Sequence, residues 1–138
     1  MKATGVRQQS IVSESSKRLL PVAFPVQAMK LINLKTSLKA LKTFNDELRH
    51  ADCFKEKNFT SGLIAFRPTK KSDPRQINHD DQDVICHIVK GTGRLRIRGK
   101  RTALRPGMIC HIPKGTPHDF AAGKKGELVL FYVLVTTV

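Results

Sequence analysis

Short apolar segments separated by turn residues run from residue 59 to residue 136, and this pattern constrains the fold more than any other feature. In strand 94–98, arginines alternate strictly with Leu95 and Ile97, so the two aliphatic side chains share one face of the strand. The apolar segments lie at 59–66, 84–89, 94–98, 101–105, 108–112 and 127–136. Strands at this spacing, with no helical period between them, predict an antiparallel β-sandwich or barrel.

The N-terminal part of the chain differs from the rest. Residues 1–25 are basic and polar, lack the apolar core of a signal peptide, and end in the breakers Pro21 and Pro25. We expect a flexible tail there, followed by a single domain at 26–138 with its core barrel at 59–135. Apolar residues then recur at helical steps, which predicts a short amphipathic helix packed on the barrel or, as an alternative, a partner-binding helix. These residues are Leu34, Leu38, Leu41, Phe44 and Leu48.

The composition is strongly basic, with 25 Lys and Arg against 11 Asp and Glu and a net charge of +14. Such a charge attracts anions. Only 6% of the residues are aromatic and none is Trp, so nucleic acid is not a favoured partner, because single strands stack on aromatic side chains. No apolar run approaches the length of a membrane-spanning helix, so we expect no membrane partner. Three widely spaced cysteines predict reduced thiols and a cytoplasmic location.

A motif of unusual spacing lies between residues 107 and 118. It consists of a glycine, five residues, and then Pro-x-Gly-x-x-His, filled by Gly107, Pro113, Gly115 and His118. This motif, and the order of the elements over 59–135, resembles the small single-domain cupins. The resemblance implies an all-β fold, the double-stranded β-helix or jelly-roll barrel, and a homodimer that pairs through its sheets and N-terminal segments.

The other cupin motif is His-x-His, four residues, Glu, six residues, Gly. Aligned on Gly91, it places Ile77 at the first His, His79 at the second His and Val84 at the Glu. In metal-binding cupins these three positions and the His of the later motif, here His118, hold one divalent ion. The resemblance therefore implies an incomplete metal cage in this chain, and Ala122 also replaces an expected Asn.

Two strand registers remain open at this site. A one-residue slip or a bulge would turn Asp83 inward beside His79 and His118 and rebuild a set of two histidines and one carboxylate, which suits a divalent transition metal such as Fe, Mn, Ni, Zn or Cu. Without the slip, which is the register we favour, Val84, Cys86 and Ile88 line the interior. The candidate ligand-binding residues are His79, His118, Cys86 and Ile88.

A second candidate surface is basic. Arg94, Arg96 and Arg98 share one strand face, and Lys100 and Arg101 adjoin it. A solvated outer face is the default interpretation, and the binding of an anionic partner is the alternative.

Three functional hypotheses follow. The first is a barrel that binds a small molecule, as a sensor or carrier, with a degenerate metal site. The second is a metal-dependent enzyme of the dioxygenase, isomerase or lyase type, which would use His79, His118 and a nearby carboxylate. The third is a basic interaction module that binds an anionic partner. The sequence does not identify the ligand.

Overall fold

The computed structural model describes residues 28–68 and 77–137. The tail predicted at 1–25 lies outside these residues. Residues 31–138 form one unit, and the fold is described for it. No helix in the described part of the chain is long and apolar enough to cross a membrane.

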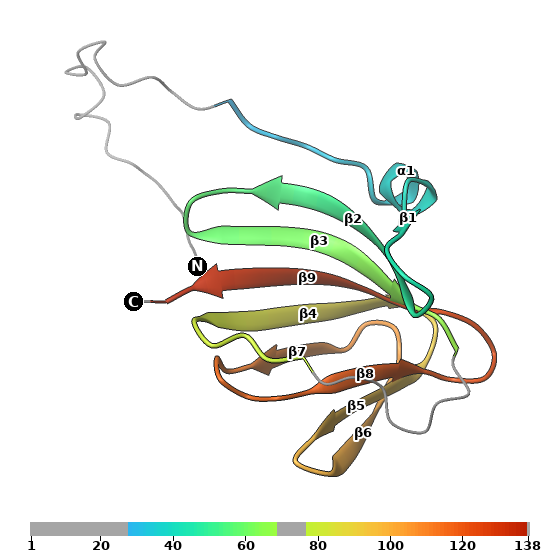
Figure 1. Ribbon diagram of the computed structural model, residues 1–138. Helices are drawn as coiled ribbons and strands as arrows, with labels where there is room; N and C mark the ends of the chain where they lie inside the picture. Colours follow the sequence, from blue (N-terminus) through green and yellow to red (C-terminus); the bar gives the residue numbers. More distant parts are fainter. Residues whose placement is uncertain (1–27, 69–76, 138) are drawn as a thin grey trace, which may run out of the picture. The chain divides into compact units, whose positions relative to one another are not determined.

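The secondary structure is mostly β-strand, as the turn-separated apolar segments predict (Figure 1). Within the described ranges the elements are α1 (Leu34–Lys39), β1 (Lys42–Thr43), β2 (Leu48–Lys55), β3 (Phe59–Phe66), β4 (Gln82–Lys90), β5 (Gly93–Ile97), β6 (Lys100–Leu104), β7 (Ile109–Ile112), β8 (Asp119–Ala122) and β9 (Leu128–Thr136).

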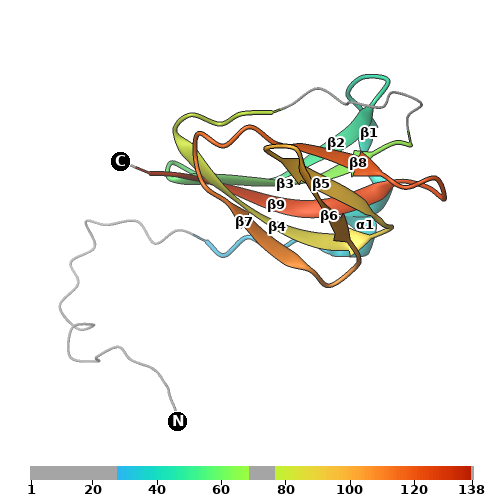
Figure 2. The same ribbon diagram turned by 90° about the horizontal axis from the view of Figure 1, so that it is seen from below.

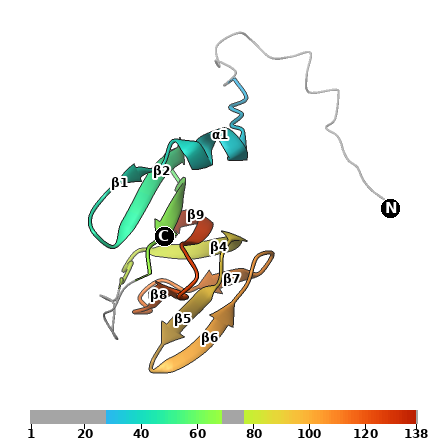
Figure 3. The same cartoon turned by 90° about the vertical axis from the view of Figure 1, so that its right-hand side faces the viewer.

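The strands form two antiparallel sheets. One sheet has six strands in the order β1-β2-β3-β9-β4-β7, and the other has three in the order β6-β5-β8. Figure 2 shows the smaller sheet lying across the larger one, and Figure 3 shows α1 with β1 and β2 at one end and the β5–β6 hairpin at the other. This arrangement confirms the predicted all-β barrel.

The main core lies between the two sheets, where inward-facing side chains alternate along each strand. On β4 these are Val84, Cys86 and Ile88, none more than 4% exposed. They pack against the other members of the core, which are Phe66, Leu95, Leu104, Ile112, Phe120, Leu128 and Leu130. Each buried Val, Leu, Ile or Phe side chain of this core stabilises the fold by about 1.5–3 kcal/mol.

A second apolar cluster covers the outer face of the larger sheet. Leu63 and Ala65 of β3 and Val129 of β9 pack there against Leu41, with Leu38 of α1 at its edge. The centre of β3 and the first residues of β9 are therefore buried on both faces, and such strands read as continuous apolar runs.

The helix is shorter than its sequence pattern predicts. The apolar stripe extends to Leu48, but α1 ends at Lys39, and Leu48 begins β2. The side-chain oxygen of Asn45 accepts hydrogen bonds from the backbone N–H groups of Glu47 and Leu48, which stabilises the β1–β2 turn. Phe44 lies in this turn and is 72% exposed. Strand pairing with β3 thus overrides the helical period beyond Leu41.

The register of β4 is regular across the candidate site. Val84 pairs with Ile112 of β7 and with Leu134 of β9, and the pairing with β9 shifts only between Ile88 and Lys90. The unslipped register is therefore the one that the chain adopts, and Asp83 lies on the face opposite to Val84.

Candidate functional site

A cavity of about 180 Å³ lies inside the barrel. Its lining is apolar except for the thiol of Cys86, two imidazoles and one phenol hydroxyl. The lining residues are Ile64, Phe66, Ile77, His79, Val84, Cys86, His118, Phe120, Leu130, Tyr132 and Leu134. Of the four residues expected to bind a ligand, His79, His118 and Cys86 line the cavity, and Ile88 does not.

His118 is held by the loop that the later motif forms. Gly115 has a φ of 78°, which glycine adopts without strain, and its N–H donates to the backbone oxygen of His79 at 2.7 Å. The backbone of His118 pairs with that of Ile77 through two hydrogen bonds. The side chain of His118 is 2% exposed, and its Nδ1 lies 2.8 Å from the carbonyl oxygen of Thr116. Because a carbonyl only accepts, Nδ1 carries a proton, so in the neutral tautomer the lone pair lies on Nε2.

His79 lies beside His118, with their ring centroids 5.9 Å apart. Burial, and then the proximity of His118, lower the pKa of His79 from its ordinary value of 6.5, and Asp81 partly opposes this change. His79 is therefore neutral at pH 7 and offers one hydrogen-bond donor and one acceptor.

All four positions assigned to the cupin metal cage line the same cavity. Ile77, His79, Val84 and His118 converge there, although they come from separate segments of the chain. Ile77 and Val84, however, carry no side-chain atom that can bind a metal.

Asp83 does not replace the missing donors. Its Oδ1 accepts a hydrogen bond from the N–H of Lys114 at 2.8 Å, and its Oδ2 lies 3.8 Å from Nε2 of His111. No group of three His, Cys, Asp or Glu side chains in the described part of the chain is placed to hold a metal ion. A catalytic transition-metal site usually needs three protein ligands. The residues present therefore do not fit the metal centre that the fold family implies.

Two further polar groups reach the cavity. The thiol of Cys86 is hydrogen-bonded to Cys110 on the neighbouring strand, which together with burial raises the pKa of Cys86 and keeps it protonated. The hydroxyl of Tyr132 lies 2.6 Å from Nε2 of His50, and burial raises the pKa of Tyr132 to about 12. Tyr132 is not among the site residues predicted from the sequence, although the alternation of β9 places it on the same face as Leu130.

Two of the five residues predicted to form a basic surface pair with one buried carboxylate. Asp119 is 1% exposed and pairs with Nη1 of Arg94 at 2.6 Å and Nη2 of Arg96 at 2.7 Å. These two arginines are therefore largely engaged within the protein. Arg98, Lys100 and Arg101 are exposed at the β5–β6 hairpin, where Arg98 has a φ of 52°.

Comparison with protein families gives one match, to the model described as "Cupin domain", over residues 62–135. The chain matches none of the curated proteins with which it was compared.

Several solved structures share the fold. TT1209 from Thermus thermophilus is 20% identical, with a TM-score of 0.65 over 78% of this chain and 98% of its own. KdgF from Halomonas sp. is 16% identical, with a TM-score of 0.64 over 80% of this chain and 96% of its own. The cupin domain of Schizosaccharomyces pombe Cnp3 is 18% identical, with a TM-score of 0.60 over 70% of this chain and 68% of that chain. At these identities the likeness establishes the fold.

Proposed function

This chain belongs to the cupin domain family, and we propose that its barrel binds a small organic molecule in the interior cavity and holds no catalytic metal there. The observation that carries the proposal is the composition of the four cage positions. They still converge on one cavity, but two are histidines and two are the aliphatic residues Ile77 and Val84. An apolar pocket with a few convergent polar groups is the usual form of a small-molecule site. A sensor or carrier role fits this arrangement.

The cavity also indicates the chemistry of the ligand. Its volume of about 180 Å³ is close to that of an engineered cavity of about 150 Å³ that binds benzene. Nε2 of His118 supplies a hydrogen-bond acceptor beside His79, and the remaining wall is largely apolar. The complementary ligand is a single ring or short chain with one hydroxyl or N–H donor.

Phenol and toluene, measured by NMR titration of the full chain, test this proposal. We expect saturable binding of both, with phenol bound more tightly. Replacing His118 with Ala, or His79 with Ala, is expected to weaken phenol about fivefold to tenfold, since one hydrogen bond contributes about 1 kcal/mol, and to change toluene little. Asn78→Ala is the control, because Asn78 is an exposed neighbour of His79 that does not line the cavity. Phenol binding that both site variants leave unchanged would refute the proposal.

Metal content distinguishes the proposed barrel without a catalytic metal from the alternative, a metal-dependent enzyme. We expect untagged protein to contain well under one equivalent of Fe, Mn, Ni, Zn or Cu by mass spectrometry, before and after soaking. Close to one equivalent, lost in both His79→Ala and His118→Ala but kept in His111→Ala, would establish the enzyme hypothesis instead.

We also propose that the protein forms a homodimer through the outer face of β4, β7 and β9. One rung of this face joins Ile109, His87 and Phe131, and the next joins His111, Ile85 and Val133. Ile109 is 71% exposed and Ile85 is 42% exposed. Contact of these apolar side chains with water is unfavourable, so burying them against a second copy of the chain favours a dimer. Sedimentation of the wild type is expected to give a dimer and that of Ile109→Lys a monomer. A monomeric wild-type protein at micromolar concentration would exclude this interface.

A further inference from the structure

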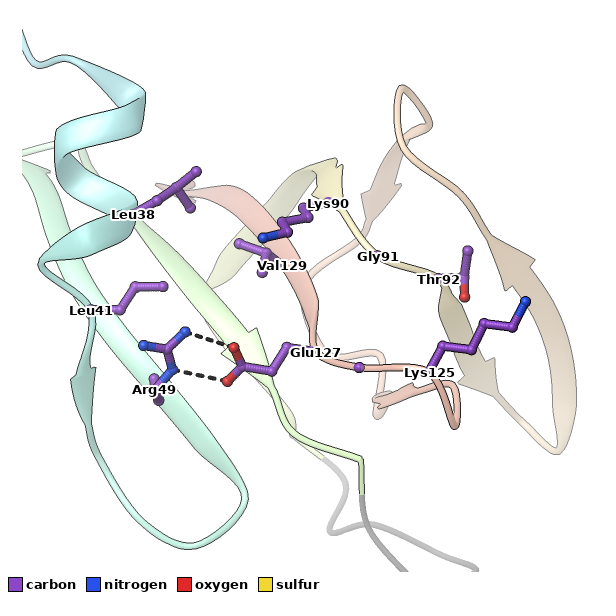
Figure 4. A pocket seen from close by; sticks show the side chains of 10 residues that line it. Leu38, Leu41, Arg49, Lys90, Gly91, Thr92, Lys125, Glu127 and Val129 are labelled. Carbon is purple, nitrogen blue, oxygen red and sulfur yellow. Dashed lines mark hydrogen bonds and ion pairs between the residues drawn. The ribbon is translucent and has the colours of Figure 1, made fainter.

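A second cavity, of about 500 Å³, lies outside the barrel core (Figure 4). It shares no lining residue with the interior cavity. The segments that build it are α1 and the residues after it, β2, the β4–β5 turn, and the chain leading into β9. Its lining residues are Leu38, Leu41, Arg49, Lys90, Gly91, Thr92, Lys125, Gly126, Glu127 and Val129.

The wall of this cavity is built by close backbone packing. Gly91 has a φ of 80°, and a Cβ at this position would lie 2.0 Å from the backbone oxygen of Glu127. Only glycine therefore lets the β4–β5 turn approach the chain before β9 so closely. Thr92 adds a hydrogen bond, since its backbone oxygen accepts from the N–H of Gly123 at 2.9 Å.

One side of the cavity is apolar. Leu38, Leu41 and Val129 belong to the cluster that covers the outer face of the larger sheet. In Figure 4 these side chains lie on the side of the pocket formed by α1 and β9. They offer a surface against which a short hydrocarbon group can be buried.

The charged groups of the lining are mostly cationic. Arg49 donates two hydrogen bonds to Glu127, from Nε to Oε2 at 2.9 Å and from Nη2 to Oε1 at 2.6 Å. The hydrogen bond from Arg49 lowers the pKa of Glu127, and the charges of Arg67 and Lys90 add to the effect. The lining contains Arg49, Lys90 and Lys125 against the single carboxylate of Glu127, which leaves two net positive charges.

We propose that this cavity binds a small amphipathic anion. Lys90 and Lys125, which come from the two closely packed segments that carry Gly91 and Glu127, attract a carboxylate or phosphate head group, and the apolar side receives a short hydrocarbon portion. The volume lies within the usual range for small-molecule sites. Binding at this site does not require a ligand in the barrel interior, because the two cavities share no lining residue.

The probes are octanoate and octyl phosphate, which carry the two head groups, with octylamine and inorganic phosphate as controls. Titration of the ¹⁵N-labelled full chain is expected to shift the amide signals of Gly91, Thr92 and Gly126 saturably with either octyl anion. The more tightly bound octyl anion identifies the preferred head group. Equal binding of octylamine would refute the charge selectivity, and equally tight binding of inorganic phosphate would refute the role of the apolar side.

Substitutions distinguish binding at a defined site from nonspecific attraction to the positive charge of the protein. Lys90→Gln and Lys125→Gln are each expected to weaken the octyl anions by up to about fivefold, the range of an exposed ion pair. Lys124→Gln is the matched control, because Lys124 is an equally charged and exposed neighbour that does not line the cavity. If Lys124→Gln weakens binding as much as Lys125→Gln, or if the shifts arise only at Ile77 and His79 in the barrel, the proposal is wrong.

Discussion

The ion pairs of Asp119 provide the sharpest test of how this barrel is held together. The carboxylate is 1% exposed, while the side chains of Arg94 and Arg96 are 19% and 16% exposed. Both arginines lie on β5, and Asp119 is the first residue of β8, so the two ion pairs connect these neighbouring strands. Asp119→Asn keeps the size of the side chain and removes its charge.

The expected cost follows from the burial of the three groups. At a separation of about 4 Å and an effective dielectric constant of about 20, one pair of charges attracts by about 4 kcal/mol. Desolvation offsets much of this gain, and removing one partner of a buried pair typically costs about 3–5 kcal/mol. Both guanidinium groups keep some contact with water, so we expect the lower end, about 3 kcal/mol. That is a large share of the roughly 5–15 kcal/mol that stabilises a domain.

Urea unfolding followed by circular dichroism measures the loss. Asp80→Asn is the control, because Asp80 is exposed and its substitution should change the free energy of unfolding by less than about 0.5 kcal/mol. Replacing Arg94 and Arg96 with Met together with Asp119→Leu should recover most of the stability, since an apolar set of similar volume often substitutes for buried charges. A loss below about 1 kcal/mol in Asp119→Asn would refute the reasoning.

Two further predictions concern the cavity. A Cβ at Gly62 would lie 2.6 Å from the hydroxyl of Tyr132. Gly62→Ala should therefore lower the free energy of unfolding, measured in urea, by about 1–3 kcal/mol. Gly123→Ala is the control and should lower it less, because the closest contact of its Cβ would be 3.3 Å. An equal loss in both variants would contradict this. Because the pKa of His79 is lowered in the folded state, the unfolded chain takes up the proton first, so stability should fall as the pH drops through about 6.5 and then level off below the folded pKa. Urea unfolding at pH 7.5 and 5.5 should show a smaller decrease in His79→Gln than in the wild type, and an unchanged decrease would exclude this linkage.

Much of the fold could be predicted because its determinants are local. The alternation in 94–98 sets the face that each residue occupies, the apolar run at 128–135 indicates a strand, and turn glycines separate the strands. The spacing of Gly107, Pro113, Gly115 and His118 indicated the barrel, and the family match over residues 62–135 agrees with it.

The helix shows where local reasoning failed. The apolar residues from Leu34 to Leu48 recur with a helical period. This period shows which residues are apolar, but it does not show on which surface each of them packs. Leu38 and Leu41 pack on the outer face of the sheet, while Leu48 packs in the main core from β2. The pairing of β2 with β3, in which Leu48 lies opposite Phe66, decided this difference, and the helical period carries no information about that partner strand.

The sequence by itself determined the barrel, the positions of His79 and His118, and the absence of donor atoms at Ile77 and Val84. Only the tertiary structure decided that Asp83 faces away from these histidines, that Asp119 pairs with Arg94 and Arg96 of β5, and that a basic cavity forms beside α1. The physical reason is that side-chain direction along a strand follows from alternation, which is local. The partner of a charge depends instead on which strands pair and in which register, and that is set by burial over the whole chain.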